Sequence, residues 1–233
     1  MTLGSPSPDR PRADPPEGLF PLARQLSYRL TPLLALTPLT PNQITGLSLI
    51  PSLGCALSFA FGGWEWKVVG GLLLVLFYTL DNCDGEIARL KGLSSAWGAK
   101  FDDFVGAFTH WVFFIGLGYG AMVERGNALW LWLGLIATAG AVVDYGIDIL
   151  FRAKTNDDQD AAREQEAVNP RQPENKVDWL IYFFHELARA EFCFLVLALA
   201  VFDATWILLP MIAIGAQAFW ITDLFERGHG WHV

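Results

Sequence analysis

Basic residues, cysteines and charged residues of either sign are all scarce in this sequence. Lysine and arginine together number 16 against 24 aspartates and glutamates, so the net charge is −8. This balance argues against a basic surface for nucleic acid, and the chain contains no nucleic-acid-binding motif. Cys55, Cys83 and Cys193 lie apart in apolar sequence without a Cys-x2-Cys pair. We therefore expect buried free thiols rather than a disulfide framework.

Apolar residues replace the missing charge, and they recur in stretches near 20 residues long. Only 17% of the chain is charged whereas 53% is apolar, and a transmembrane helix needs about 20 predominantly apolar residues. The sequence therefore predicts an all-α integral membrane protein with six transmembrane helices in one bundle. The predicted spans cover residues 42–61, 66–91, 95–123, 128–153, 177–202 and 205–225, with a short turn at 62–65.

Polar segments divide the rest of the chain. The proline-rich residues 1–18 predict a disordered cytosolic tail, and they do not resemble a cleavable signal peptide. In residues 19–36, leucine and phenylalanine are interleaved with arginine and glutamine, which is typical of an interfacial amphipathic helix. We expect one membrane catalytic domain over 40–227, with a polar cytosolic loop at 154–176 and a C-terminal tail at 228–233.

The distribution of basic residues predicts the orientation of the bundle. Six spans place both termini on one side of the membrane, and that side receives fourteen of the 16 lysines and arginines. Only Lys67 and Arg125 fall near the opposite face. Because basic residues favour the cytoplasmic side, we expect both termini and the acidic residues discussed next to face the cytoplasm. Five tryptophans gather near the opposite face, as an interfacial aromatic belt would: Trp64, Trp66, Trp130, Trp132 and Trp206.

Three aspartates interrupt the second and third predicted spans. Asp81 and Asp84 are three residues apart and share one helix face, and Asp102 comes from the next apolar segment. Ionisable residues at membrane depth usually face a polar interior and mark function. Carboxylate oxygens are ligands for hard divalent cations such as Mg²⁺ or Mn²⁺. The sequence therefore predicts a divalent metal site built from two helices.

The spacing of these residues resembles the signature of the CDP-alcohol phosphotransferase (CDP-alcohol phosphatidyltransferase) family, D-x2-D-G-x2-A-R-x8-G-x3-D-x3-D. The chain matches seven of the eight fixed positions: Asp81, Asp84, Gly85, Ala88, Arg89, Gly98 and Asp102. The resemblance implies transfer of a phosphatidyl or other phosphoalcohol group from a CDP-alcohol to an acceptor hydroxyl, with release of CMP, in phospholipid biosynthesis.

The same resemblance implies roles for the individual positions. The three aspartates would bind two divalent cations, Mg²⁺ or Mn²⁺, that hold the CDP pyrophosphate. Substrate binding would involve Gly85, Ala88, Arg89 and Gly98. Residues 41–45, Pro-Asn-x-x-Thr, look like the element that opens the first span in this family, although they also fit an ordinary helix start.

The eighth position of the signature departs from the family, because Gly106 stands where the last aspartate would act as the general base. His110, one turn further along the same stripe, is one candidate replacement, since imidazole suits general-base work near neutral pH. Asp103 is another candidate, although it is about 100° round the helix from Asp102. A third possibility is that no protein base operates. The alternatives to an enzyme are a family member that binds metal and CDP-alcohol without efficient turnover, or a transporter or scaffold that uses the acidic residues for ions.

Further polar residues lie in the later spans. Arg189, with Glu191 beside it, occupies a fifth-helix position that carries cavity-facing polar residues in relatives, so it is a candidate for substrate binding. Asp144 is a candidate for lining the cavity, and Asp148 with Arg152 predicts a local ion pair. The expected partners are a CDP-alcohol, an acceptor alcohol and membrane lipid. Homodimerisation is common in relatives, so a homodimer is possible.

Overall fold

A computed structural model describes residues 22–152 and 192–229, and every element in these two ranges is helical. Four helices are long and apolar enough to cross a membrane: α2 (Pro41–Phe61), α3 (Trp64–Lys91), α4 (Ala96–Arg125) and α5 (Leu129–Arg152), the last through Phe151. They correspond to the first four predicted spans. The prediction of an all-helical integral membrane protein is confirmed at this level.

The last two predicted spans are supported less fully. Of residues 177–202, the described part contains α8 (Phe192–Val201), and the rest lies outside the described residues. The sixth span corresponds to the 3-10 turn η1 (Thr205–Ile207) and α9 (Leu208–His229), of which Thr205–Ala218 is apolar. Helix α9 continues past the end predicted at residue 225. Six spans therefore remain a prediction, and the tail at 1–18 and the loop at 154–176 lie outside the described residues.

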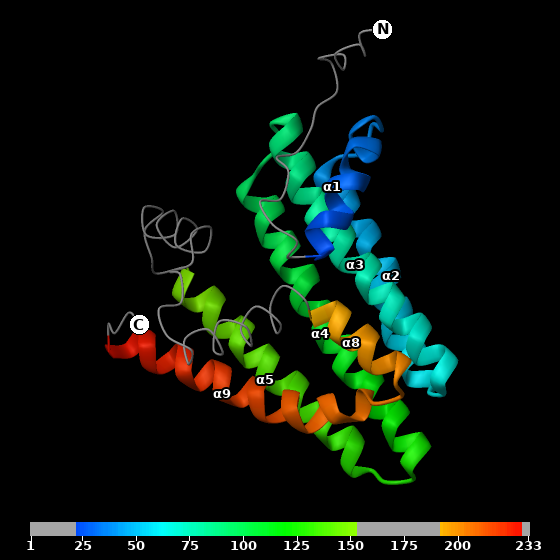
Figure 1. The fold of residues 1–233 in the computed structure, drawn as a ribbon. Helices are drawn as coiled ribbons and strands as arrows, with labels where there is room; N and C mark the ends of the chain where they lie inside the picture. The colour runs from blue at the N-terminus through cyan, green and yellow to red at the C-terminus, as the bar shows by residue number, and fades with distance from the viewer. Residues whose placement is uncertain (1–21, 153–191, 230–233) are drawn as a thin grey trace, which may run out of the picture.

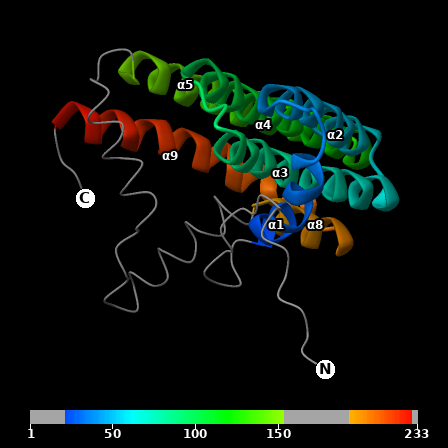
Figure 2. The same ribbon diagram turned by 90° about the horizontal axis from the view of Figure 1, so that it is seen from above.

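The helices are arranged around α2 and α3. Helix α2 packs against both α3 and α4, α4 packs against α5, and α5 packs against α9. Helices α1 (Leu22–Ala35) and α8 contact α3 on the side away from α2, as the view from above shows (Figures 1 and 2). The buried core lies between these helices and includes Phe59, Leu74, Phe77, Phe113 and Val196.

Glycines on α4 allow its close approach to α2. A Cβ added at Gly116 would lie 2.3 Å from the carbonyl oxygen of Ala56, and one at Gly120 would lie 2.0 Å from that of Phe59. Small residues spaced four apart are a common way to bring two membrane helices together. This contact fixes α2 against α4, and the site described below uses residues from both.

The predicted amphipathic helix at 19–36 is present as α1, but the face that it buries is not rich in leucine. The buried residues Ala23, Ser27 and Thr31 are small or polar and recur every four positions. Ser27 donates a hydrogen bond of 2.8 Å to Oε1 of Glu86 on α3. Leu26 and Leu33 of α1 are exposed, and a position at the membrane interface remains a prediction.

The turn between α2 and α3 is shorter than predicted, because α3 already begins at Trp64. Gly62 and Gly63 have φ of 70° and 77°, a region that glycine adopts without a Cβ penalty. The amide of Gly63 donates to Oε1 of Glu124 at 2.5 Å. The same end of the bundle contains Lys67, which contacts Glu124 and Asp203.

Candidate active site

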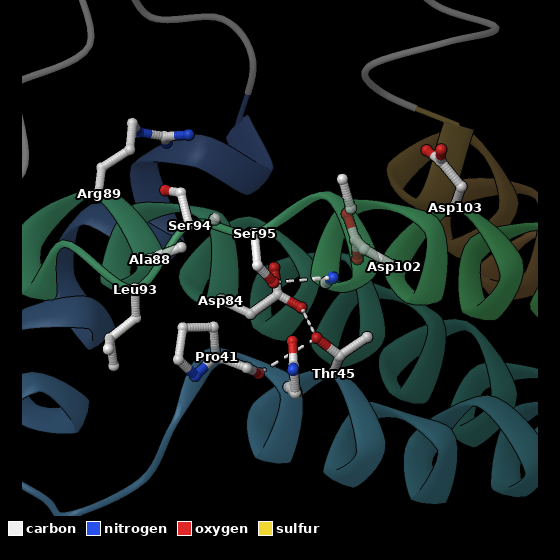
Figure 3. Close-up of a pocket in the computed structure, with 14 residues that line it drawn as sticks. Pro41, Thr45, Asp84, Ala88, Arg89, Leu93, Ser94, Ser95, Asp102 and Asp103 are labelled. Carbon is white, nitrogen blue, oxygen red and sulfur yellow. Dashed lines mark hydrogen bonds between the residues drawn. The ribbon is translucent and has the colours of Figure 1, made fainter. Parts of the chain in front are cut away.

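A cavity of about 480 Å³ opens where the beginning of α2, the end of α3 and the beginning of α4 meet. Figure 3 shows side chains from all three helices around it. Six of the seven signature residues line it, together with several of their neighbours. The lining residues are Pro41, Asn42, Thr45, Asp84, Gly85, Ala88, Arg89, Leu93, Ser94, Ser95, Gly98, Ala99, Asp102 and Asp103.

The first turn of α2 forms one wall, and its sequence explains why the helix starts there. The Thr40 side chain accepts a hydrogen bond from the amide of Gln43 at 3.4 Å, and the Gln43 side chain accepts one from the amide of Thr40 at 3.0 Å. This reciprocal capping box, with Pro41 in the first turn, begins a helix at a defined residue. The positive end of the α2 dipole therefore faces the cavity.

Thr45 on the next turn of α2 orients the central carboxylate of the signature. Asp84 is only 4% exposed, and its Oδ2 accepts a hydrogen bond from Thr45 Oγ1. The same hydroxyl lies 3.1 Å from the carbonyl oxygen of Pro41. Figure 3 shows Thr45 and Asp84 pointing toward one another. The rotamer of Asp84 is thus set by a different helix from its own.

Asp102 lies close to both other signature aspartates, within interaction range of Asp81 and of Asp84. Its Oδ1 is buried and has no hydrogen-bond partner among the described residues. Asp84 and Asp102 line the cavity, whereas Asp81 is not among the described lining residues. The structure therefore brings the three predicted metal ligands close together, and two of them line the cavity.

The donor set suits a hard divalent cation, although the described residues contain no three acidic, histidine or cysteine side chains already arranged to hold an ion. Three carboxylates supply oxygen ligands of the kind that Mg²⁺ and Mn²⁺ prefer. The unpartnered Oδ1 of Asp102 fits a ligand that bonds to something other than protein. Binding would require small movements of the side chains.

The predicted substrate-binding residues Gly85, Ala88, Arg89 and Gly98 all line the same cavity. Gly98 makes room for Asn42, because a Cβ there would lie 2.8 Å from Asn42 Oδ1. Arg89 is the one cation among the described lining residues, and it lies at the opposite end of the cavity from Asp103 (Figure 3). Arg189 lies outside the described residues.

Comparison with known proteins agrees with this geometry. The CDP-alcohol phosphatidyltransferase family matches residues 38–159, just over half of the chain. The chain belongs to the CDP-alcohol phosphatidyltransferase family. The matched region contains every residue that lines the cavity.

Individual relatives match shorter parts of the chain than the family does. A bifunctional IPC transferase and DIPP synthase of Rubrobacter xylanophilus is 37% identical over 108 residues, covering 46% of this chain and 23% of that protein. A protein of the same name from Aquifex aeolicus is 32% identical over 96 residues, covering 41% and 21%. A phosphatidylinositol phosphate synthase of Cutibacterium acnes is 31% identical over 91 residues, covering 39% and 43%. The chain thus spans less than half the length of these relatives.

The two candidate bases are placed differently. Asp103 lines the cavity beside Asp102, although one-residue spacing on an ideal helix favoured another face. His110 is not among the described residues that line this cavity. Its Nδ1 lies 3.0 Å from the carbonyl oxygen of Gly106, and its Nε2 lies 2.9 Å from the hydroxyl of Tyr78. Both ring nitrogens are therefore engaged in hydrogen bonds within the protein.

Some residues of the site were missed or only partly anticipated from the sequence. Ser94 and Ser95 line the cavity, and Ser95 also caps α4 by accepting a hydrogen bond from the amide of Gly98 at 3.0 Å. A serine three residues before a signature glycine is a detectable N-cap signal. Asp144 and Asp148 line a second cavity instead. The side chain of Arg152 lies outside the part of the chain that the structure describes.

Proposed function

We propose that this protein is a membrane transferase that moves a phosphatidyl or other phosphoalcohol group from a CDP-alcohol to an acceptor hydroxyl, with release of CMP. One observation carries the proposal: a single cavity brings Asp84, Arg89 and Asp102 together with the small signature residues, from the two consecutive helices α3 and α4. Membership of the CDP-alcohol phosphatidyltransferase family supports the same reaction.

The diphosphate of the CDP-alcohol has two complementary partners in the cavity. The N-terminus of α2 presents the positive end of its helix dipole, which favours anions. Arg89 adds a guanidinium that can bind phosphate oxygens in a bidentate manner. Gly85 and Gly98 have no side chain and therefore leave space in the cavity near these groups. We therefore place the nucleotide end of the substrate between α2 and the end of α3.

Asp81, Asp84 and Asp102 would hold Mg²⁺ or Mn²⁺, two ions if the family pattern applies. Bound there, divalent cations would neutralise the pyrophosphate and the charge that develops on the leaving CMP. Thr45 would keep Asp84 in one orientation. The unpartnered Oδ1 of Asp102 supports this assignment.

The transfer is a substitution at phosphorus. The acceptor oxygen forms a bond to the phosphorus that carries the alcohol, the bond from that phosphorus to the bridging oxygen breaks, and CMP leaves with the electron pair. The acceptor hydroxyl loses one proton in the process. We propose Asp103 as the group that takes this proton, because it lines the cavity whereas His110 is hydrogen-bonded to Tyr78 and Gly106. A carboxylate within reach of the reacting hydroxyl can act as a general base.

The cavity is proposed to face the cytoplasm. CDP-alcohols present a water-soluble nucleotide, and the basic residues predict that this end of the bundle lies on the cytoplasmic side. Six membrane spans, cytoplasmic termini and a possible homodimer belong to the same proposal.

The deciding experiment measures CDP binding and CMP release separately on the purified protein with Mg²⁺ or Mn²⁺. CDP-diacylglycerol would be tested as donor against a panel of acceptor alcohols. Binding together with CMP release that depends on acceptor and metal is the expected result. CDP binding without release for any acceptor would instead indicate a binding protein, and absence of both would refute the assignment.

A further inference from the structure

The linker between α1 and α2 is hydrogen-bonded to the end of the signature helix by one lysine. Lys91, the last residue of α3, donates two hydrogen bonds of 2.9 Å, one to the carbonyl oxygen of Thr37 and one to that of Leu39. Hydrogen bonds from a charged donor are stronger than those between neutral groups. Both carbonyls lie just before Thr40, the N-cap of α2. Lys91 therefore holds the chain immediately ahead of the first turn of α2.

The linker is itself a hydrogen-bonded turn. The hydroxyl of Thr37 donates to the carbonyl oxygen of Leu34 at 2.6 Å, and the amide of Leu39 donates to that hydroxyl at 3.4 Å. Thr40, which follows, forms the capping box that starts α2. Because the turn is closed by these bonds, its attachment to Lys91 also fixes where α2 begins relative to α3.

The start of α2 and the end of α3 form two walls of the candidate active site. Pro41, Asn42 and Thr45 line it from α2, and Arg89 lines it from α3 (Figure 3). Arg89 and Lys91 are two positions apart, which is about 200° round a helix of 3.6 residues per turn. One side chain therefore lines the cavity, and the other meets the linker. Lys91 is not among the described residues that line the cavity, so its contacts act on the site through the backbone of α2.

We infer that Lys91 is a positioning residue that fixes the start of α2 relative to Arg89, and thereby sets the affinity for the diphosphate of the nucleotide. This inference rests on the proposed function, because it takes the diphosphate to lie between the α2 terminus and the guanidinium. Both groups must reach the diphosphate at once, and a displacement of about 1 Å in a positioning group can cost about 10²-fold. The ammonium group bonds to protein carbonyls, so its contribution is geometric.

Three variants separate positioning from a simple loss of charge. Lys91→Met keeps a long side chain but removes both hydrogen bonds. Lys91→Arg keeps a cationic donor and should restore the contact with the linker. Lys100→Met is the matched control, because Lys100 is an exposed lysine near the start of α4, at the same end of the bundle. Lys100 is not among the described residues that line the cavity.

The first measurement compares CDP affinity with turnover of a CDP-alcohol in Mg²⁺. Lys91→Met should raise the Kd for CDP and the KM for the CDP-alcohol by about tenfold, the loss expected for one hydrogen bond to a charged group. The kcat should stay nearly unchanged, because the interaction lost serves binding in the ground state and the transition state alike. Lys91→Arg and Lys100→Met should both behave like the unmodified protein.

These results can fail in distinguishable ways. An unchanged Kd in Lys91→Met would overturn the inference, and so would an equal rise in Lys91→Arg or in Lys100→Met. In each of these cases the unmodified protein still binds CDP, and the proposed function stands. Absence of CDP binding by the unmodified protein would overturn the proposed function, and this inference with it.

Hydrogen exchange of backbone amides gives a second measurement that does not depend on turnover. In Lys91→Met, the amides of residues 37–45 should exchange faster, because local opening of that segment becomes easier, whereas those of α4 should not change. Weaker CDP binding without faster exchange at 37–45 would mean that Lys91 contacts the ligand directly, which contradicts a positioning role. Faster exchange in all helices with a lower melting temperature would mean a general loss of stability, and would contradict it as well.

Discussion

The two ends of the helical bundle both contain carboxylates, but among the described residues only one end pairs them with a buried lysine. At the end formed by the start of α3 and the end of α4, Lys67 Nζ lies 2.6 Å from Glu124 Oε2 and 2.8 Å from Asp203 Oδ1. At the signature end, Asp84 accepts a hydrogen bond from a neutral hydroxyl, and Oδ1 of Asp102 has no partner among the described residues.

We propose that this difference separates a structural cluster from a binding site. A buried charge without compensation is costly, so the paired end joins α3, α4 and the segment after α8 through one lysine. Arg125 adds to it, because its guanidinium lies 5.0 Å and 4.5 Å from the ring centroids of Trp130 and Trp206. We propose that a ligand compensates the carboxylates at the signature end. Intramembrane carboxylates of that kind usually mark function.

Removing a carboxylate from the signature end should have the largest effect on activity. We expect Asp84→Asn to lower CMP release by about 10³-fold, because loss of one charge-stabilising group in an active site typically costs 10²–10³-fold. Its melting temperature in detergent should stay close to that of the unmodified protein. The comparison between the two ends fails if Asp84→Asn keeps full activity but melts much earlier.

The proposed base gives the next largest effect. Asp103→Asn should lower CMP release by about 10²-fold, at the lower end of typical general-base contributions. Adding Gly106→Asp to that variant should restore much of the rate, because the Cβ position of Gly106 has nothing within 4 Å and a side chain fits there. His110→Ala is the control and should retain CMP release. Loss of activity in His110→Ala, with Asp103→Asn active, would assign the role to the imidazole.

Breaking the paired end should affect stability instead of chemistry. Lys67→Met leaves Glu124 and Asp203 without their shared cation, and because both carboxylates are exposed, loss of the two ion pairs costs about 1 kcal/mol. The expected result is a lower unfolding temperature in detergent and unchanged CDP affinity. Asp203→Asn is the milder control, since its side chain is 58% exposed and exposed ion pairs contribute about 0–1 kcal/mol. A loss of CDP affinity in Lys67→Met without destabilisation would contradict this division of roles.

The smallest effect is expected at Thr45, which supports a signature residue without belonging to the signature. Thr45→Val removes the hydroxyl that bonds Asp84 and should raise the Mg²⁺ concentration needed for half-maximal CDP binding by about tenfold, since a lost hydrogen bond to a charged group costs about 1.5–3 kcal/mol. Thr45→Ser should behave like the unmodified protein. The idea would be abandoned if the serine variant were as impaired as the valine variant.

Much of the fold and part of the site could be predicted from local sequence. The apolar stretches gave α2 to α5 with bounds within a few residues, because hydropathy and helix caps act over short distances. The three cysteines are buried free thiols, as predicted. The signature spacing placed Asp84, Arg89, Gly98 and Asp102 around one cavity, because fixed intervals on two consecutive helices with a short turn leave few other arrangements.

Tertiary packing decided what local periodicity could not. His110 lies on the stripe that follows Asp102, yet a hydroxyl from Tyr78 on another helix occupies its Nε2, and its face of α4 lines the second cavity. The small and polar residues of α1 are buried because this face packs against α3, where Ser27 donates a hydrogen bond to Glu86. Helical period fixes which residues of one helix share a face, but the neighbour that each face meets depends on how the helices cross. That crossing is set by long-range contacts such as Gly116 and Gly120 against α2.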